Sequence, residues 1–362
     1  MKSFLEIFEN QTRFGTKIYA PDYLKEGTYP IVDQSKKLIC GYKNEEDGLY
    51  RDVPFIIFGD VSRNIKFIDF PCFLGADGSV ILKVIDKEWD TKFLYYYLLN
   101  QNIPNTGYNR HYKFLKELKF KEYSLDKQKE YAALLDDINK LIETSKREIA
   151  LYDKLIKSRF NEMFGDVLHK SNNRKIKDAC TSMVRGPFGS ALKKEYFVPK
   201  GEKTYKVYEQ KHAIQKDHTI GSYYVSEEKF YSLRRFEVKP GDIIMSCSGT
   251  IGEFYQLPPG CEKGLMNQAL LKFTLDRNMV NETYFLQAMS LIIGDVDRSG
   301  TAIQNITSVS IIKETNLFIP NIDAQNTFAS FVNQIDKLKF NVQKRIDYYQ
   351  ELLNKKMDEY FN

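Results

Sequence analysis

The chain has 362 residues, 43% of them hydrophobic and 14% aromatic, a composition that excludes a disordered protein and allows two domains of ordinary size. Its 53 Lys and Arg residues and 48 Asp and Glu residues leave a net charge of only +5, so a polyanionic partner would have to bind local basic patches. The five cysteines are widely separated and no apolar run approaches the ~18 residues of a membrane span, so we expect a cytoplasmic protein with reduced thiols, no structural zinc and no membrane contact.

Residues 1–124 are predicted to form a first globule of mixed α/β structure. The runs YPIVDQ, VPFIIFGD and SVILKVI are rich in β-branched and aromatic residues and are separated by Gly, Asn, Asp and Pro, which is typical of short strands. The segment KFLYYYLLNQ, starting at Lys92, is predicted to be a short helix, and a polar stretch starting at Gly107 follows it.

Residues 125–164 are predicted to form one long helix. The segment contains neither Pro nor Gly and is rich in Lys, Glu, Leu, Asp and Gln. A helix of this length would extend for about 60 Å at about 1.5 Å per residue. Because it carries an apolar stripe, it needs a partner that covers the stripe.

Residues 165–321 are predicted to form a second globule of the same class. KTYKVYEQ, GDIIMS and NQALLKFTL have the composition of strands. The segment TYFLQAMSLI, starting at Thr283, resembles the short helix of the first globule, and a polar stretch starting at Gly300 follows it. The two globules therefore end in corresponding ways.

The last segment, residues 322–362, aligns without a gap on the first long helix when Ile322 is matched with Leu125, and Gln128 then aligns with Gln325. The apolar positions recur at heptad spacing, which predicts a coiled coil of the two copies. A chain that repeats in this way has an approximate two-fold axis, and a two-fold axis perpendicular to the helices makes them antiparallel. The alternative is that each helix packs only on its own globule. The predicted seam consists of Ile142, Ile149, Tyr152, Ile156, Val342, Ile346, Tyr349 and Leu353.

The stretch GDIIMSCSGTIG, from Gly241 to Gly252, invites comparison with a nucleophile site or a phosphate-binding turn. It lacks the G-x-S-x-G order of a nucleophile elbow, and Glu253 stands where a phosphate loop has lysine. We interpret it as a strand running into a polar turn, in which Ser248 offers a hydroxyl to a ligand and Cys247 and Gly249 could equally be structural. A thiol enzyme at Cys247 is the least favoured alternative.

Methyl transfer or nuclease chemistry by this chain is not indicated. The nearest match to a [DN]-P-P-[FY] motif, Leu257-Pro258-Pro259-Gly260, lacks both its polar and its aromatic end. Carboxylates near Lys239 form no more than a chance metal pattern. We therefore expect no catalytic residue, no metal site and no cofactor.

Nearly the whole chain resembles the specificity subunit of Type I restriction-modification systems. The resemblance rests on GPFGSALKKEYF, YKVYEQKHAI, RRFEVKPGDIIMSCSGTIG, GLMNQALLKF, SGTAIQNIT and FIPNIDAQ in the second half, and on YPIVDQSKKLICGY, KFLYYYLLNQ and KSRFNEMFGD in the first. It implies a non-catalytic reader of double-stranded DNA with two target-recognition domains, each binding one half of a split site. It also implies that the two helices space these domains and dock two methyltransferase subunits, and that restriction subunits join the full complex.

Residues that would contact DNA are expected in loop-like polar clusters. Arg and Lys bind guanine and phosphates, Asn and Gln bind adenine, and small hydroxyls bind either; for any one of them the alternative is an ordinary solvated side chain. The candidates in the first globule are Arg13, Lys17, Arg63, Asn64, Asn109, Arg110, His111 and Lys113. Those in the second are Arg185, Lys193, Lys194, Gln210, Lys211, His212, Ser248, Arg298, Thr301, Gln304 and Asn305.

A second hypothesis remains open from the sequence. The same plan of globule, helix, globule and helix would suit a non-catalytic scaffold whose two globules bind protein or RNA, with the helices serving only as a spacer.

Overall fold

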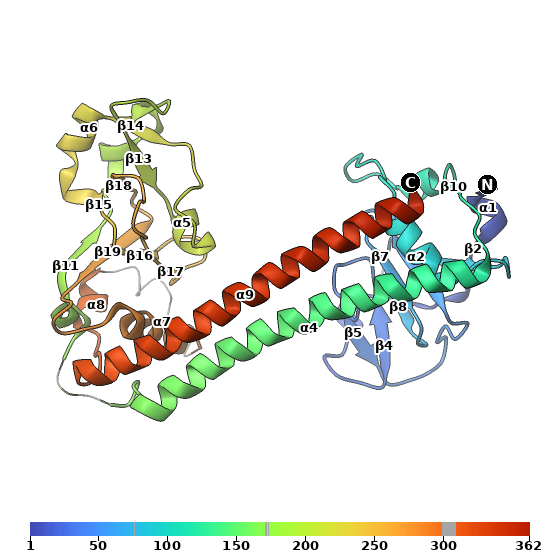
Figure 1. Ribbon diagram of the computed structural model, residues 1–362, viewed down its shortest axis with the longest axis horizontal. Helices are drawn as coiled ribbons and strands as arrows, with labels where there is room; N and C mark the ends of the chain where they lie inside the picture. Colours follow the sequence, from blue (N-terminus) through green and yellow to red (C-terminus); the bar gives the residue numbers. More distant parts are fainter. Residues whose placement is uncertain (76, 171, 173, 299–308) are drawn as a thin grey trace. The chain divides into compact units, whose positions relative to one another are not determined.

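The computed structural model describes residues 1–362 except 76, 171, 173 and 299–308. The chain divides into two compact units, each described here by itself. Unit 1 comprises Met1–Glu148 and Asn341–Asn362, and unit 2 comprises Ile149–Phe340. The two segments predicted to be long helices are α4 (Leu125–Phe164) and α9 (Ile322–Phe361), and both are labelled in Figure 1. Each of them contributes residues to both units.

Unit 1 contains two four-stranded sheets and a short two-stranded one. The first sheet is antiparallel throughout, with strand order β2 (Phe8–Asn10), β9 (Ser79–Val84), β6 (Phe55–Gly59), β7 (Ile65–Ile68). The second has the order β3 (Lys17–Ile18), β8 (Phe73–Gly75), β4 (Tyr29–Val32), β5 (Gly41–Lys43), and β8 runs parallel to both of its neighbours. The third pairs β1 (Lys2–Ser3) with β10 (Lys119–Phe120), and the short helices are α1 (Phe4–Ile7), α2 (Thr91–Leu99) and α3 (Tyr112–Leu115).

The core of unit 1 lies between the two four-stranded sheets. Phe55 and Ile57 from β6 contact Val32 and Leu74 from the second sheet in one apolar cluster. Every residue of β6 is buried, which is why FIIFG reads as a continuous apolar run rather than an alternating one.

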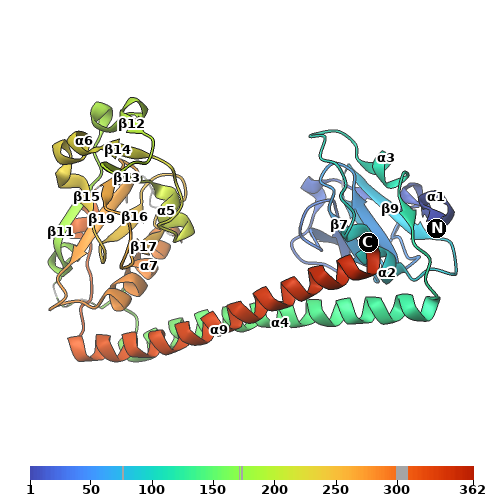
Figure 2. The same cartoon turned by 45° about the horizontal axis from the view of Figure 1, so that its top comes forward.

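Unit 2 contains a four-stranded and a five-stranded sheet. The four-stranded sheet is antiparallel, with the order β11 (Cys180–Arg185), β19 (Leu270–Leu275), β16 (Ile243–Ser246), β17 (Phe254–Gln256). The other has the order β12 (Phe197–Val198), β14 (Tyr224–Ser226), β13 (Thr204–Tyr208), β18 (Gly264–Met266), β15 (Glu237–Val238), with β13 and β18 parallel. Figure 2 shows these strands with α5 (Gln210–Gln215), α6 (Glu227–Ser232) and α7 (Glu282–Arg298); α8 (Val309–Glu314) completes the unit.

The four-stranded antiparallel sheets of the two units share one strand order, despite their different sequences. In both sheets, the strand that comes first in the chain lies at the edge and pairs with the strand that comes last in the chain. The spatial order β2–β9–β6–β7 in unit 1 therefore corresponds to β11–β19–β16–β17 in unit 2. In both units, the second sheet contains a parallel pair whose earlier strand also pairs antiparallel with a neighbour, β4 with β5 and β13 with β14. The internal repeat therefore extends beyond the long helices.

Gln128 and Gln325, matched by the sequence repeat, make matching hydrogen bonds. Gln128 Oε1 accepts from the Asp90 amide at 2.9 Å, and its Nε2 donates to the carbonyls of Glu88 and Tyr123, both at 2.9 Å. Gln325 accepts from the amide just before α7 at 2.8 Å and donates to two carbonyls at 3.2 and 2.8 Å. Both side chains are buried. Each glutamine thus fixes the start of a long helix to the start of the short helix in its unit.

Within unit 1, the first part of α4 lies antiparallel to the last part of α9. Tyr131 stacks on Tyr360 with ring centroids 3.7 Å apart. Further along α4, Ser145 accepts a hydrogen bond from Arg345 at 3.2 Å, and Arg345 also pairs with Glu148. Because the contacted positions rise along α4 as they fall along α9, the two segments run in opposite directions.

Within unit 2, the last part of α4 lies antiparallel to the first part of α9. Asp153 accepts a hydrogen bond from Lys339 at 2.7 Å, and the rings of Phe160 and Phe328 lie 5.3 Å apart. Phe160 also stacks on Tyr284 of α7 at 5.5 Å. The aromatic end of α4 is therefore part of the core of this unit.

The predicted seam positions face protein rather than solvent. Ile142, Val342, Ile346 and Leu353 are buried, and Ile149, Tyr152, Ile156 and Tyr349 are half-buried. Their burial agrees with the helix contacts observed inside each unit.

Candidate nucleic-acid interface

Two predicted contacts of unit 1, Arg13 and Lys17, lie in the segment that follows β2. Arg13 is 72% exposed; it lies 3.7 Å from Glu9 and its guanidinium covers the Phe14 ring at 4.6 Å. Lys17, on the short strand β3, is exposed and lies 3.6 Å from Asp77. Both basic groups can reach a polyanion, because their present partners are exposed and such surface ion pairs are weak.

Arg63 and Asn64 lie in the turn between β6 and β7. Arg63 has a left-handed backbone with φ of 62°, and its side chain donates to the Ile103 carbonyl at 3.0 Å. Asn64 donates to the Gln34 carbonyl at 2.8 Å. These bonds join loops that are distant in sequence, so both residues have a structural role that the sequence did not indicate.

The polar stretch after Gly107 presents a second group of predicted contacts. Arg110 is 83% exposed and lies 3.7 Å from the buried carboxylate of Asp60. Asn109 is exposed and donates to the Thr106 carbonyl at 2.6 Å. Lys113 is exposed beside the Phe114 ring at 5.0 Å. The loop therefore offers two cations and an amide to a ligand.

His111 and His212, both predicted to contact DNA, are fully buried. His111 Nε2 accepts from the Thr106 amide at 3.2 Å while Nδ1 lies 2.9 Å from the Asp60 carbonyl. His212 Nδ1 accepts from the Glu209 amide at 2.9 Å, and its Nε2 lies 2.8 Å from the Ile220 carbonyl. Since both ring nitrogens of each imidazole are used inside the fold, the structure corrects the prediction that these side chains face DNA.

In unit 2, Lys193 and Lys194 are exposed, whereas Arg185 and Lys211 are half-buried. Arg185, at the end of β11, donates to the Gln268 carbonyl at 2.8 Å. Lys193, which joins two short 3₁₀ turns, and Lys194, the first residue of the second turn, are both exposed, and Lys193 lies 3.7 Å from Glu195. The α5 candidates Gln210 and Lys211 are half-buried, and Lys211 pairs with Glu209 at 2.7 Å.

The stretch from Gly241 to Gly252 is a strand followed by a turn, as predicted. Ser246 donates to the Thr250 carbonyl at 2.6 Å and accepts from the Glu253 amide at 3.0 Å, so it closes the turn. Cys247 is buried, and burial raises the pKa of its thiol to about 11, which does not suit a nucleophile. Ser248 is exposed at the tip of the turn.

Three predicted contacts, Thr301, Gln304 and Asn305, lie outside the described residues. Arg298 is the last residue of α7, and its side chain also lies outside the described part of the structure.

Two buried lysines that the sequence did not single out fix the surface loops. Lys66 donates to the Asp33 carbonyl at 2.6 Å and to the Lys37 carbonyl, and burial lowers its pKa. Lys206 donates to the carbonyls of His218 and Thr219 at 2.6 and 3.1 Å. An isolated lysine in a strand has no sequence signal that distinguishes it from a solvated one.

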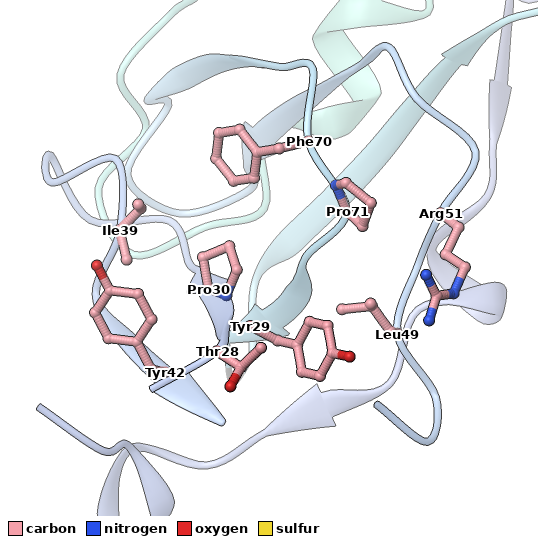
Figure 3. A pocket seen from close by; sticks show the side chains of 9 residues that line it. All are labelled: Thr28, Tyr29, Pro30, Ile39, Tyr42, Leu49, Arg51, Phe70 and Pro71. Carbon is pink, nitrogen blue, oxygen red and sulfur yellow. The ribbon is translucent and has the colours of Figure 1, made fainter. Parts of the chain in front are cut away.

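Figure 3 shows a pocket of about 420 Å³ in unit 1. None of its lining residues carries a carboxylate, imidazole or thiol, and its one cation, Arg51, pairs with Glu46 at 2.6 Å. The pocket is lined by Thr28, Tyr29, Pro30, Ile39, Tyr42, Leu49, Arg51, Phe70 and Pro71.

Across the described residues, no group of three or more His, Cys, Asp or Glu side chains is placed to hold a metal ion. In the same part of the chain, no helix combines the length and apolarity required to cross a membrane.

A protein-family model described as the Type I restriction modification DNA specificity domain matches residues 166–348, about half of the chain. The chain belongs to this family. A specificity subunit of the Escherichia coli Type I restriction enzyme EcoR124I/EcoR124II is 31% identical over 94 residues, which cover 25% of this chain and 23% of that protein. The aligned part thus spans about a quarter of that curated relative.

Solved structures of specificity subunits have the same mixed helix and strand fold. The S subunit of a Type I restriction-modification system from M. genitalium superposes with a TM-score of 0.57 at 16% identity, covering 100% of this chain and 95% of that one. A chain from a structure described as the basis of complex assembly and conformational transition of the type I R-M system gives 0.58 at 12% identity, covering 100% and 97%. The likeness of fold therefore extends over the whole chain, whereas the family model matches residues 166–348.

Proposed function

We propose that this chain is the DNA-sequence specificity subunit of a Type I restriction-modification enzyme. Unit 1 and unit 2 each bind one half of a bipartite target in double-stranded DNA. The chain performs no bond-breaking step itself, and it positions two methyltransferase subunits and, in the full complex, restriction subunits on that DNA. These enzymes act on DNA in the cytoplasm.

The shared strand order of the two four-stranded sheets is the observation that carries this proposal. Two domains of one fold, with different side chains on their loops, suit two half-sites of different sequence. Unit 1 exposes Arg13, Arg110 and Lys113, whereas unit 2 exposes Lys193 and Lys194. Base contacts depend on such differences, because each base pair presents its own pattern of donors and acceptors.

The long helices would serve as a continuous antiparallel coiled coil that relates the units by an approximate two-fold axis. The antiparallel contacts found inside each unit, and the matched anchors Gln128 and Gln325, support this role. A stiff spacer would fix the separation of the half-sites near a helical turn of DNA, ~34 Å or somewhat more.

Selection from random duplexes tests the proposal. The full chain, alone and with the methyltransferase subunit of its system, is incubated with duplexes that contain two randomised blocks at varied spacing, and bound DNA is sequenced. We expect two short motifs at one fixed spacing. Failure to enrich any duplex, with or without the methyltransferase, would refute the proposal, and enrichment of RNA instead would favour the scaffold hypothesis.

Variants then assign each motif to its unit. Arg110→Ala with Lys113→Ala in unit 1 should weaken selection of one motif, and Lys193→Ala with Lys194→Ala in unit 2 should weaken selection of the other. Lys87→Ala is the matched control, because this lysine is exposed and lies outside both the long helices and the predicted contacts. Loss of both motifs by either pair of changes would contradict independent reading by the two units.

A further inference from the structure

Tyr108 is the most exposed large apolar side chain in the described part of the chain. Its ring is 99% exposed, whereas no other aromatic ring among the described residues is more than 70% exposed. It lies in the loop of unit 1 that joins α2 to α3 (Figure 2). Single exposed rings are common on protein surfaces, so the structure of the loop beneath the ring decides whether the ring has a role.

The loop that carries Tyr108 is closed by hydrogen bonds between residues on either side of the ring. Asn109 donates to the Thr106 carbonyl at 2.6 Å, and the buried His111 accepts through Nε2 from the Thr106 amide at 3.2 Å. Gly107, directly before the ring, has a φ of 76°, a left-handed conformation that glycine adopts without strain. The backbone therefore forms a tight turn with the ring at its tip.

The same loop is fixed to the first sheet of unit 1 through Asp60, which follows β6 and is 4% exposed. The Asp60 carbonyl accepts from the His111 amide at 2.8 Å and lies 2.9 Å from His111 Nδ1. The Asp60 carboxylate accepts from the Tyr112 amide at 2.7 Å. The ring at the tip is thus presented on a fixed support, so that a ligand can bind it without the cost of ordering the loop.

Both faces of the Tyr108 ring are open to a ligand, because the protein covers almost none of it. The other exposed rings beside predicted DNA contacts differ in this respect. The Arg13 Cζ lies over the Phe14 ring at 4.6 Å from its centroid, and the Arg185 Cζ lies over the Phe188 ring at 5.6 Å. A ring that lies against the wall of a DNA groove needs one free face, whereas a ring between two bases needs both.

We propose that Tyr108 stacks between neighbouring bases of the half-site that unit 1 binds, an inference that rests on the proposed function. Arg110, which is 83% exposed, and the exposed Lys113 belong to the same segment and supply positive charge for the adjacent phosphates. A side chain inserted at a base step partly unstacks the duplex, and an aromatic ring can stack on any base. The contact adds affinity without identifying a base through hydrogen bonds.

The first test uses the full chain with its methyltransferase partner and a duplex recovered by the selection above. Tyr108→Ala should weaken binding about tenfold. Tyr108→Phe, which keeps the ring and removes only the hydroxyl, should bind like the wild type. Both variants should keep the wild-type melting temperature, because the replaced side chain is outside the packed core. Tyr231→Ala is the matched control, since it removes a ring that is 51% exposed in unit 2, and it should also bind like the wild type.

Duplexes that carry 2-aminopurine at one position at a time locate the ring, because the fluorescence of this base depends on how it stacks on its neighbours. At saturating protein, the wild type and Tyr108→Phe should change the emission at a position of the unit 1 motif where Tyr108→Ala leaves it unchanged.

Three results would count against the proposals. Wild-type affinity of Tyr108→Ala, at unchanged melting temperature, would overturn the stacking contact. Equal losses of affinity in Tyr108→Phe and Tyr108→Ala would also overturn it, because the hydroxyl rather than the ring would then make the contact. A wild-type chain that binds no duplex would instead refute the proposed function, and the stacking contact with it.

Discussion

Replacing Gln128 with alanine removes the side chain that joins α4 to the start of α2. The amide of Asp90 then loses its acceptor, and the carbonyls of Glu88 and Tyr123 lose their donor. Gln128 is only 1% exposed, so water cannot replace these bonds without opening the site.

The expected loss in free energy of unfolding follows from these contacts. A buried amide without a partner costs about 1–3 kcal/mol, and each carbonyl that loses a neutral donor adds about 0.5–1.5 kcal/mol. Partial relaxation offsets some of this, so we expect a loss of about 2–4 kcal/mol. With a urea m-value of about 2 kcal/mol per M, the unfolding midpoint should fall by about 1–2 M.

Tryptophan fluorescence measures this loss where it occurs. The chain contains one tryptophan, Trp89, which is 6% exposed and lies between the two residues of its loop that Gln128 binds. The control is Gln343→Ala on α9, which removes only an exposed bond to Asp347 at 2.9 Å and should leave the midpoint unchanged. If Gln128→Ala and Gln343→Ala unfold at the same urea concentration, the anchoring role is wrong.

The variant Gln128→Glu adds a dependence on pH. The introduced carboxylate would face two carbonyl oxygens in a buried site, so its folded pKa should lie above the unfolded value near 4.3. The introduced carboxyl group then ionises at a lower pH in the unfolded chain than in the folded one, so the variant should be destabilised at pH 7.5. It should recover stability as the pH falls through the folded pKa, because the protonated acid can donate a hydrogen bond again. A loss of stability independent of pH between 7.5 and 5 would contradict this reasoning.

Three further predictions concern the buried aromatic and titratable groups. Because burial raises the pKa of Cys247 to about 11, iodoacetamide at pH 8 should label it about a hundredfold more slowly in the folded chain than in urea; equal labelling by mass spectrometry would refute the assignment. Burial lowers the pKa of His212, so its contribution to stability is complete above the unfolded pKa near 6.5 and is lost as the pH falls below it; His212→Gln should flatten the dependence of stability on pH between 7.5 and 5.5, and an unchanged profile would argue against it. Phe361 packs 5.3 Å from Phe93 and 5.1 Å from Tyr97, so Phe361→Ala should destabilise unit 1 by about 3–5 kcal/mol in the Trp89 assay, whereas the exposed Tyr348→Ala should not.

The long helices and their repeat were predictable from sequence because their signals are local. Absence of Pro and Gly, helix-forming composition and heptad spacing define α4 and α9 to within a residue. The alignment that matches Gln128 with Gln325 also predicted a correspondence, and the structure shows that it extends to their hydrogen bonds.

The candidate DNA contacts were only partly predictable. Arg110, Lys113 and Ser248 are exposed, as expected. By contrast, His111 and His212 are buried. The side chains of Arg63 and Asn64 donate to carbonyls of loops that are distant in sequence. The bonds that draw these side chains inward come from carbonyls that no local pattern marks, such as that of Asp60 for His111. Polar residue type in a loop therefore indicates a possible contact but not its direction.

Sequence by itself determined where the helices lie, that the chain repeats, and which family it resembles, because periodicity and motif order are properties of neighbouring residues. Only the tertiary structure decided that the four-stranded sheets of both units share one strand order, and which polar side chains reach the surface. Those features depend on backbone pairings between segments far apart in the chain, and such pairings leave little trace in the local order of residues.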